Sequence, residues 1–397
     1  MLRFNSRTLA PTLVFAVSGL LGVVHAAAGC ATSQNGFLGD EAGIIDQEGG
    51  PGDGGPLAEG GEGGGQGGPR IACGPTYCRS DEKCVSNACM YDCTGTKVPG
   101  DYATITAAVT ALAATGADVT ICLGAIQAGE PVSISDVGAH KKALKIIATA
   151  PLLTTLGSVS VSSGFSEVTL VGFGTSSSMS VSGAAKVNLR GLKLSSTSTY
   201  ALQLSSSSLA MPTTVTVDGC DIGATTASGY GIYINNSLTA PLKVSVANSY
   251  IHGGAYGVYV YGSSTSTGLD LSIVNNTIDK ASYGLNLAGS PTAVVKYVNN
   301  IISNSTMVGV TVASGMTGVT HSNNALFGNV TNYSGIAVEG TGYVKTDCLL
   351  DMAATGVPQT KLGSPCRGAG KADVAPPVDF WNSARGSKID LGAVQGP

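Results

Sequence analysis

Charged side chains that could perform acid–base chemistry recur at matched positions in the middle of the chain. They form three opposite-charge pairs, each about one repeat apart: Arg190 with Asp218, Lys193 with Asp221, and His252 with Asp279. Carboxylates beside Lys, Arg and His could serve as general acids and bases in polysaccharide cleavage, or could hold a Ca²⁺ ion against uronate groups. Such charges also stack simply because like charges repel, and exposed pairs contribute only about 0 to 1 kcal/mol each. We favour the structural interpretation and predict no catalytic residue, because the sequence shows no cleft that pairs two acids or an acid with a base.

Two tyrosines offer a binding surface instead. Tyr233 and Tyr259 lie at the same place in two alternating segments, Tyr230-Gly-Ile-Tyr-Ile234 and Tyr256-Gly-Val-Tyr-Val260. Because alternate residues of a strand face opposite sides, both rings are expected to point outward, one above the other. They could form a platform on which sugar rings stack; the alternative is cross-strand pairing that only stabilises the sheet. The candidate glycan-binding residues are these two tyrosines and the six charged residues above.

A sequence repeat positions all of these residues. Apolar residues recur 28, 29, 27, 24 and 24 residues apart, at Leu194, Ile222, Ile251, Ile278, Ile302 and Leu326. A period in this range is typical of a solenoid. Three positions earlier the residue is always glycine or asparagine: Gly191, Gly219, Asn248, Asn275, Asn299 and Asn323. These two residue types tolerate positive φ, so we predict one left-handed turn per coil, with the asparagines stacked as a ladder.

Alternating segments in each coil predict which side chains fill the core. The inward column is expected to contain Leu202, Ile232, Val258, Leu285, Val310 and Ile336, and the outward column Gln203, Tyr233, Tyr259, Asn286, Thr311 and Ala337. Another inward column contains His321 among Leu189, Val217, Val246, Ile273 and Tyr297. We therefore interpret His321 as an interior histidine. Hydroxyl residues such as Thr216, Ser245, Ser272 and Thr320 are expected to face outward.

The N-terminal 70 residues indicate export. Residues 1–30 combine Arg3 and Arg7 with an apolar stretch that ends at Ala27-Ala28-Gly29-Cys30. This ending resembles the lipobox of bacterial lipoproteins, which implies a lipid on Cys30 and an outer-membrane anchor, facing the cell surface or the periplasm. Ordinary signal cleavage near residues 26–28 is the alternative. Residues 31–70 are rich in Gly, Pro and acids and predict a flexible tether.

Ten cysteines suggest disulfides in this exported chain. Residues 71–97 contain Cys73, Cys78, Cys84, Cys89 and Cys93, whose spacing fits a zinc site poorly. Five is odd, so we expect Cys122, which alternation turns outward on the first coil, to supply the sixth partner. Cys348 and Cys366 form a natural pair near the C-terminus. That leaves Cys220 as a buried free thiol.

Both ends of residues 98–397 resemble a known family. The segments Val98-Pro-Gly-Asp-Tyr-Ala-Thr-Ile and Asp118-Val-Thr-Ile-Cys-Leu-Gly124 look like the start of right-handed parallel β-helices of the pectin-lyase-like superfamily, and Ile389-Asp-Leu-Gly-Ala393 resembles the closing motif of bacterial surface members. The resemblance implies an all-β right-handed parallel β-helix of about ten coils over residues 98–345. A capping helix at about Thr104 to Ala114 precedes the coils, and a closing segment at 346–397 follows them.

The family's catalytic motifs do not carry over. The Asn-Thr-Asp, Asp-Asp, Gly-His-Gly and Arg-Ile-Lys segments of polygalacturonases and the Asp-Pro-His of alginate epimerases do not occur here. Pectate lyases need several acids in neighbouring coils for Ca²⁺ and an arginine base. This sequence matches that pattern only weakly, with Asp218, Asp221, Asp279 and Arg190. A calcium ion is therefore expected only if the chain is a lyase.

These patterns and the composition give three candidate functions. With 397 residues, 12% charged and a net charge of -4, the chain has no basic stripe for nucleic acid. The leading hypothesis is a non-enzymatic, monomeric surface lipoprotein that binds a polysaccharide, a cell-surface glycan or another extracellular surface, without a cofactor or metal. The alternatives are a polysaccharide lyase or hydrolase, and a passive stalk or coat protein.

Overall fold

A computed structural model describes residues 71–396, except 75, 127–128, 136–141, 163, 207–211, 238–239, 264–267, 290 and 353–355. The signal segment 1–30 with Cys30, and the tether 31–70, lie outside the described residues. Contacts divide the chain into two units, 1–61 and 62–397, and every described residue belongs to the second. No helix among the described residues is long and apolar enough to cross a bilayer.

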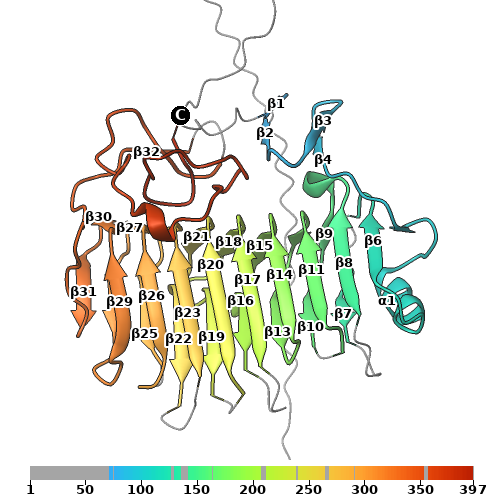
Figure 1. The fold of residues 1–397 in the computed structure, drawn as a ribbon, viewed down its shortest axis with the longest axis horizontal. Coiled ribbons are helices and arrows are strands. Elements are labelled where there is room, and N and C mark those ends of the chain that lie inside the picture. The colour runs from blue at the N-terminus through green and yellow to red at the C-terminus, as the bar shows by residue number, and fades with distance from the viewer. Residues whose placement is uncertain are drawn as a thin grey trace, which may run out of the picture. The chain divides into compact units, whose positions relative to one another are not determined.

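The chain winds into a coil of parallel strands, each of which pairs with its counterpart one turn later (Figure 1). Three sheets result, here named I, II and III. Sheet I contains β5 (Thr96–Val98), β6 (Val119–Leu123), β8 (Ala143–Ala148), β11 (Glu167–Val171), β14 (Lys186–Arg190), β17 (Thr213–Asp218), β20 (Leu242–Ala247), β23 (Leu269–Val274), β26 (Val294–Val298) and β29 (Gly318–Ser322).

Sheets II and III complete each turn of the coil. Sheet II contains β9 (Thr155–Leu156), β12 (Gly174–Thr175), β15 (Lys193–Ser196), β18 (Asp221–Ala224), β21 (Tyr250–Gly253), β24 (Thr277–Asp279), β27 (Ile301–Ser303) and β30 (Ala325–Phe327). Sheet III contains β7 (Val132–Ile134), β10 (Val159–Val161), β13 (Met179–Ser182), β16 (Tyr200–Ser205), β19 (Tyr230–Asn236), β22 (Tyr256–Gly262), β25 (Tyr283–Ala288), β28 (Val308–Val312) and β31 (Thr331–Gly335). The described coil thus makes about nine turns, close to the ten expected.

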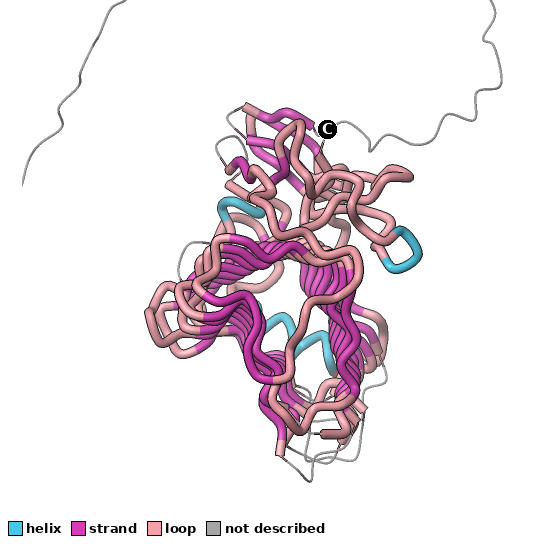
Figure 2. The backbone as a smooth tube through the Cα atoms, turned by 90° about the vertical axis from the view of Figure 1, so that its left-hand side faces the viewer, coloured by secondary structure: helices cyan, strands magenta, loops and turns pink. Residues whose placement is uncertain are grey.

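Apolar columns fill the interior of the coil, as the repeat predicts. The six apolar residues of the repeat, from Leu194 to Leu326, are at most 1% exposed. The column that contains His321 has the expected register, and the His321 ring stacks on Tyr297 at 4.8 Å. Figure 2 looks along the coil and shows the three sheets around this interior.

The last coil departs from the predicted register. Val310 pairs with Tyr333 rather than with Ile336, which is 46% exposed, and Ala337 packs against the core instead of facing outward. The segment Ser334-Gly-Ile-Ala-Val338 matches the pattern of earlier strands. However, the corner between β30 and β31 is short. Tyr333 lies seven residues after Leu326, the same spacing that separates Val258 from Ile251, so Tyr333 occupies the position expected for Ile336. The apolar pattern alone could not reveal this corner.

A left-handed turn joins sheet I to sheet II in every coil of the repeat. Gly191, Gly219, Asn248, Asn275, Asn299 and Asn323 all have φ between 50° and 60°, so the predicted column of positive φ is confirmed. The continuous amide ladder lies one residue later, where Asn276, Asn300 and Asn324 are buried and bond to one another. In the turn column itself, Asn299 donates to Asn275, but the other side chains reach different partners.

Helix α1 (Ile105–Ala113) covers the start of the coil. The Oγ1 of Thr104 accepts a hydrogen bond from the Ala107 amide and so caps the helix N-terminus. Ile105, Ala108 and Val109 are buried against the first strands, and Figure 2 shows the helix across the far end of the coil. This agrees closely with the predicted capping helix, and it shields strand edges that would otherwise be open.

Two segments pack on the outside of the coil. The N-terminal module consists of two hairpins, β1 (Ile71–Cys73) with β2 (Thr76–Cys78) and β3 (Lys83–Val85) with β4 (Ala88–Met90). The closing segment, residues 346–396, contains β32 (Leu350–Asp351), β33 (Gln359–Thr360) and the short 3-10 helix η2 (Ala372–Val374). A second 3-10 helix, η1 (Pro151–Leu153), lies between β8 and β9.

Four disulfides involve these two segments. Within the module, Cys73 pairs with Cys84 and Cys78 with Cys89. The disulfide between Cys93 and Cys122 joins the module to the first coil, and Cys348 pairs with Cys366 in the closing segment. Cys220 is a buried free thiol whose pKa burial raises to about 12.

Candidate functional site

Tyrosines gather on the outward face of sheet III. The rings form two stacked columns, one with Tyr200, Tyr233 and Tyr259 and the other with Tyr230, Tyr256 and Tyr283. Within a column the ring centroids are 5.0 to 5.8 Å apart and the planes lie within 16° of parallel. Between the columns the centroids are 4.8 to 5.4 Å apart and the planes tilt by 49° to 55°. With Tyr261, which is 43% exposed, they form what we name the tyrosine patch.

Small residues explain why two columns face the same side. Tyr230 and Tyr233 are three residues apart, so strict alternation would separate them. The strand ladder pairs the residues on either side of Gly231 but skips Gly231 itself. A Cβ on Gly231 would lie 2.6 Å from the carbonyl oxygen of Gly257 in the next coil. The backbones therefore approach closely at this position, and alternation breaks there.

The patch combines aromatic rings with amides. Gln203, Asn235 and Asn286 are half-buried neighbours in the same outward columns. Burial raises the pKa of the Tyr233, Tyr256 and Tyr259 hydroxyls, so these stay neutral hydrogen-bonding groups at neutral pH. Offset aromatic stacks contribute about 0.5 to 1.5 kcal/mol per pair, which also supports a stabilising role. A half-exposed tyrosine ring also offers an apolar face and a polar hydroxyl to a ligand, and the two roles are compatible.

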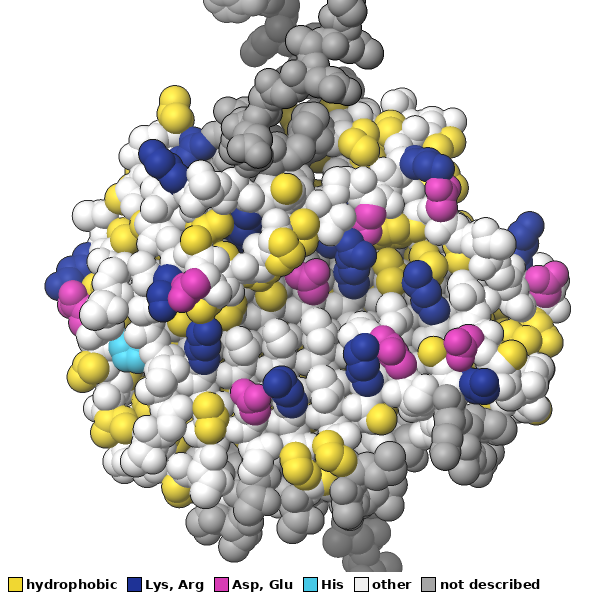
Figure 3. All heavy atoms as spheres, in the orientation of Figure 1, with side chains coloured by type: hydrophobic (Ala, Val, Ile, Leu, Met, Phe, Trp, Pro, Cys, Tyr) yellow, Lys and Arg dark blue, Asp and Glu magenta, His cyan; other side chains and the backbone are white. Residues whose placement is uncertain are grey.

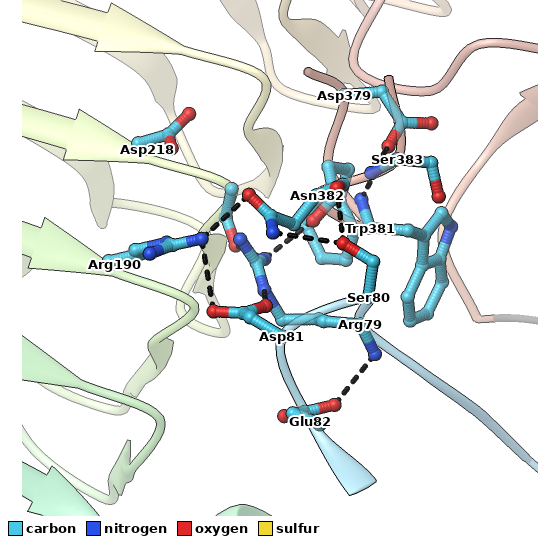
Figure 4. A network of polar contacts seen from close by, with 12 residues as sticks. Arg79, Ser80, Asp81, Glu82, Arg190, Asp218, Asp379, Trp381, Asn382 and Ser383 are labelled. Atoms are coloured by element: carbon cyan, nitrogen blue, oxygen red, sulfur yellow. Dashed lines mark hydrogen bonds and ion pairs between the residues drawn. The ribbon is translucent and has the colours of Figure 1, made fainter. Parts of the chain in front are cut away.

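Among the charged candidates, Arg190 and Asp218 are register neighbours but do not pair with each other. Arg190 forms an ion pair with Asp81 of the module at 3.0 Å, and Asp218 accepts a hydrogen bond from Asn248 at 2.9 Å. Figure 4 shows no contact between Arg190 and Asp218. Arg190 and Asp218 are therefore stacked in neighbouring coils as predicted, but they form no ion pair, because the module brings another acid to Arg190.

The other two charge pairs also form differently. Lys193 is the register neighbour of Asp221, and His252 that of Asp279. However, Asp221 pairs with His252 at 3.0 Å, whereas the buried Asp279 accepts hydrogen bonds from Ser303 and Asn304. Lys280 lies 3.6 Å from Asp279 as well. The six charged residues thus do not form one site, although their positions in the coil are as predicted.

The module and the closing segment clasp each other over the turns of Gly191 and Gly219. Nη1 of Arg79 donates to the carbonyl oxygens of Gly219, at 3.0 Å, and Phe380, at 2.5 Å (Figure 4). The Ser80 amide donates to the Trp381 carbonyl at 2.9 Å. Segments about 300 residues apart in the sequence therefore meet on one face of the coil. We name these contacts the clasp.

A cleft of about 520 Å³ opens beside the clasp. Its floor is the outward face of sheet II at Thr155, Gly174, Lys193 and Asp221, which are successive register neighbours. One wall comes from the module and the other from the closing segment, with these lining residues: Tyr77, Arg79, Glu82, Val357, Phe380 and Trp381. Burial raises the pKa of the Glu82 carboxyl, and the Arg79 amide donates to that carboxyl at 2.7 Å. The repeat contains no signal for this cleft, because its walls come from the module and the closing segment.

The described residues provide little support for a calcium centre. The only group of three or more possible metal ligands found close together among them is Cys73, Cys78 and Cys89, which are disulfide cysteines. Asp218, Asp221 and Asp279 have the separate partners given above. Figure 3 shows acidic and basic side chains mixed on the drawn face, with no continuous basic stripe among its described residues.

Sequence reasoning found Tyr233 and Tyr259 but missed most of the tyrosine patch. Tyr200, Tyr230, Tyr256 and Tyr283 each begin a strand of sheet III, and each is followed by Ala or Gly. This repeated dipeptide is the signal that could have identified the second column. Arg79 and Trp381 of the clasp carry no comparable signal, since neither belongs to the repeat.

A family model agrees with this architecture. Residues 177–348 match a family model described as "Right handed beta helix region". The chain is similar to a solved structure titled "Crystal structure of pectate lyase Pel9A", with 13% sequence identity and a TM-score of 0.39, over 72% of this chain and 90% of that chain. The sequence matches none of the curated proteins compared with it. From its parallel three-sheet coil and the matched family region, we conclude that the chain has a right-handed parallel β-helix.

Proposed function

We propose that this protein binds a polysaccharide or cell-surface glycan through the tyrosine patch. The observation that carries the proposal is the convergence of seven half-buried or exposed tyrosines on four successive strands of sheet III. Tyrosine has an apolar ring and a polar hydroxyl, so it can contact both the carbon face and the hydroxyls of a sugar. The amides of Gln203, Asn235 and Asn286 supply further donors and acceptors.

The expected N-terminal segments fit a display role. A lipid on Cys30 would anchor the protein at the outer membrane, and the Gly-rich tether at 31–70 would link that anchor to the coil. The lipid, the export and the surface location are parts of the proposal. In this role the protein acts as a monomer and needs no cofactor.

A glycan array with residues 71–397 is the direct test. The key variant is Tyr259→Ala combined with Tyr261→Ala, because Tyr261 is 43% exposed and its loss should disturb the fold least. We expect binding to weaken about tenfold or more, as for truncation of central contact residues. Ser334→Ala, in the same outward column beyond the patch, is the control and should bind normally. Equal binding by the double variant and the wild type, or binding by neither, would remove the proposal.

Polysaccharide cleavage is the second candidate, and the cleft over Lys193 and Asp221 is the observation that favours it. Only two acids line the cleft, Glu82 and Asp221, and they come from different elements. Incubation with a polysaccharide panel would reveal unsaturated products of a lyase or new reducing ends of a hydrolase. Cleavage that Asp221→Asn abolishes would establish this function. If neither unsaturated products nor new reducing ends are formed, binding remains the better explanation.

A further inference from the structure

The cleft is a formed concavity that the tyrosine patch does not use. Its volume of about 520 Å³ lies within the range of ordinary small-ligand sites, about 300 to 1,000 Å³. Further along sheet II, Tyr250 packs under the closing segment with Val357, Phe380 and Trp381. The outward face of β9, β12, β15 and β18 is therefore left open between the module and the closing segment. Its floor consists largely of small residues, which leave room for a ligand.

Arg79 brings unused donors to this cleft. The residue is only 5% exposed, and both hydrogen bonds found for its guanidinium come from Nη1. Nη2 and Nε have no hydrogen-bond partner among the described residues, although the Asp81 carboxylate lies 3.6 Å from Nε. Buried polar groups almost always have partners, so Nη2 is a donor available to an acceptor that a ligand brings.

The guanidinium remains charged in this setting. Burial alone would lower the pKa of Arg79, but Tyr91, Asp81 and Asp218 raise it, and the net direction is upward. The guanidinium lies against the turns of Gly191 and Gly219, both of which line the cleft. A ligand that reaches these turns would meet a cationic donor.

Lys193 adds a second cation on the floor of the cleft. No ion pair within 4.0 Å is found for its ammonium among the described residues, since the neighbouring Asp221 pairs with His252. Its other register neighbour is Gly174, which has no side chain to block access. Glu82 and Asp221 are the acids of the cleft, and they can accept hydrogen bonds from hydroxyl or amino groups.

We infer that the cleft binds a small organic carboxylate that also carries hydroxyl or amino groups, with Arg79 and Lys193 as its cationic contacts and Tyr77 and Val357 beside its apolar part. A sugar acid and a short peptide with a free C-terminus both have this chemistry. The inference requires binding only, and it does not depend on the tyrosine patch.

Calorimetric titration of residues 71–397 with two matched probe pairs tests the inference. The pairs are glucuronic acid with glucose, and tri-alanine with its C-terminal amide, so that the two sources of carboxylate are distinguished. We expect one acid to bind at least about tenfold more tightly than its neutral partner, as loss of one charged contact implies. Lys193→Gln should weaken that binding by a similar factor, and Ser195→Trp should abolish it by filling the floor.

Two control variants separate this inference from the proposed function. Lys243→Gln removes a lysine that pairs with Asp270 on sheet I, away from the cleft, and should leave acid binding unchanged. The tyrosine variant of the glycan array should also bind the acid normally. The inference is overturned if neither acid binds, if acid and neutral partner bind equally, or if Lys193→Gln and Ser195→Trp bind like the wild type.

Discussion

The turn between sheets I and II has two halves that differ in one residue type. Gly191 and Gly219 occupy the half beneath the module, and four asparagines occupy the half beneath the closing segment. All six have the same positive φ, so backbone conformation does not explain the difference. The neighbours do: a Cβ on Gly219 would lie 2.5 Å from Nη1 of Arg79, and one on Gly191 would lie 3.0 Å from the Tyr91 hydroxyl.

In the asparagine half, the side chains of the turn form hydrogen bonds to the closing segment. Asn275 donates to the carbonyl oxygens of Asp390, at 3.0 Å, and Gly392, at 3.3 Å. Asn299 both donates to and accepts from the backbone of Lys371, and Asn323 donates to the Ala369 carbonyl. Nη2 of Arg385 reaches Oδ1 of Asn248 at 2.8 Å. The turn thus has glycine where the module covers it and asparagine where the closing segment covers it.

The largest expected effect is in the glycine half. Gly219→Ala should destabilise the fold by about 3 kcal/mol or more, because positive φ and a collision with Arg79 act together. Gly116→Ala is the matched control, since Gly116 has φ of 68° and nothing within 4 Å of the added Cβ. That change should cost only about 1 to 2 kcal/mol. Denaturant unfolding measures both, and equal losses would contradict the steric explanation.

A smaller loss is expected in the asparagine half. Asn275→Gly keeps the turn conformation but removes the ties to the closing segment, and it leaves buried carbonyls without donors. We expect a loss of about 1 to 3 kcal/mol. Hydrogen exchange should become faster at residues 387–396, while residues 71–93 stay protected. Unchanged exchange in the closing segment would show that these bonds do not hold it.

Sequence reasoning succeeded where the repeat determines structure and failed where a distant segment does. The period and the positive φ of the turn were predictable, because every coil repeats the same local requirement. The partners of Arg190 and Asn275 were not, since Asp81 and Asp390 lie more than 100 residues away and outside the repeat. The second tyrosine column was missed for a local reason: strict alternation ignores the interruption at Gly231.

The smallest expected effects are responses to pH, with opposite signs at the two ends of the coil. Burial raises the pKa of Glu82 above 4.5. Its contribution to the free energy of unfolding is therefore complete below pH 4.5 and is lost as pH rises through the pKa of the folded state. Burial lowers the pKa of His321 below 6.5. Its contribution to the free energy of unfolding is therefore complete above pH 6.5 and is lost as pH falls through the pKa of the folded state.

Hydrogen exchange, corrected for intrinsic rates, can follow both ends across this range. Residues 71–93 should loosen as pH rises, and residues 318–345 should loosen as pH falls. Glu82→Gln and His321→Phe should each flatten the response of their own end only. If the hydrogen exchange of one end depends on pH equally in the wild type and in the variant of that end, another titrating group causes the dependence.

A double-mutant cycle between Gly219→Ala and Arg79→Ala measures whether the Arg79 side chain is what excludes a Cβ at position 219. The disulfide between Cys93 and Cys122 keeps the module attached when Arg79 is truncated, so all four proteins can be compared by denaturant unfolding. If Arg79 is the reason for glycine at 219, Gly219→Ala should cost about 1 to 2 kcal/mol in the Arg79→Ala background, close to the Gly116→Ala control, and the cycle should show strong coupling. Equal costs of Gly219→Ala in both backgrounds would show that Arg79 does not determine the residue at position 219.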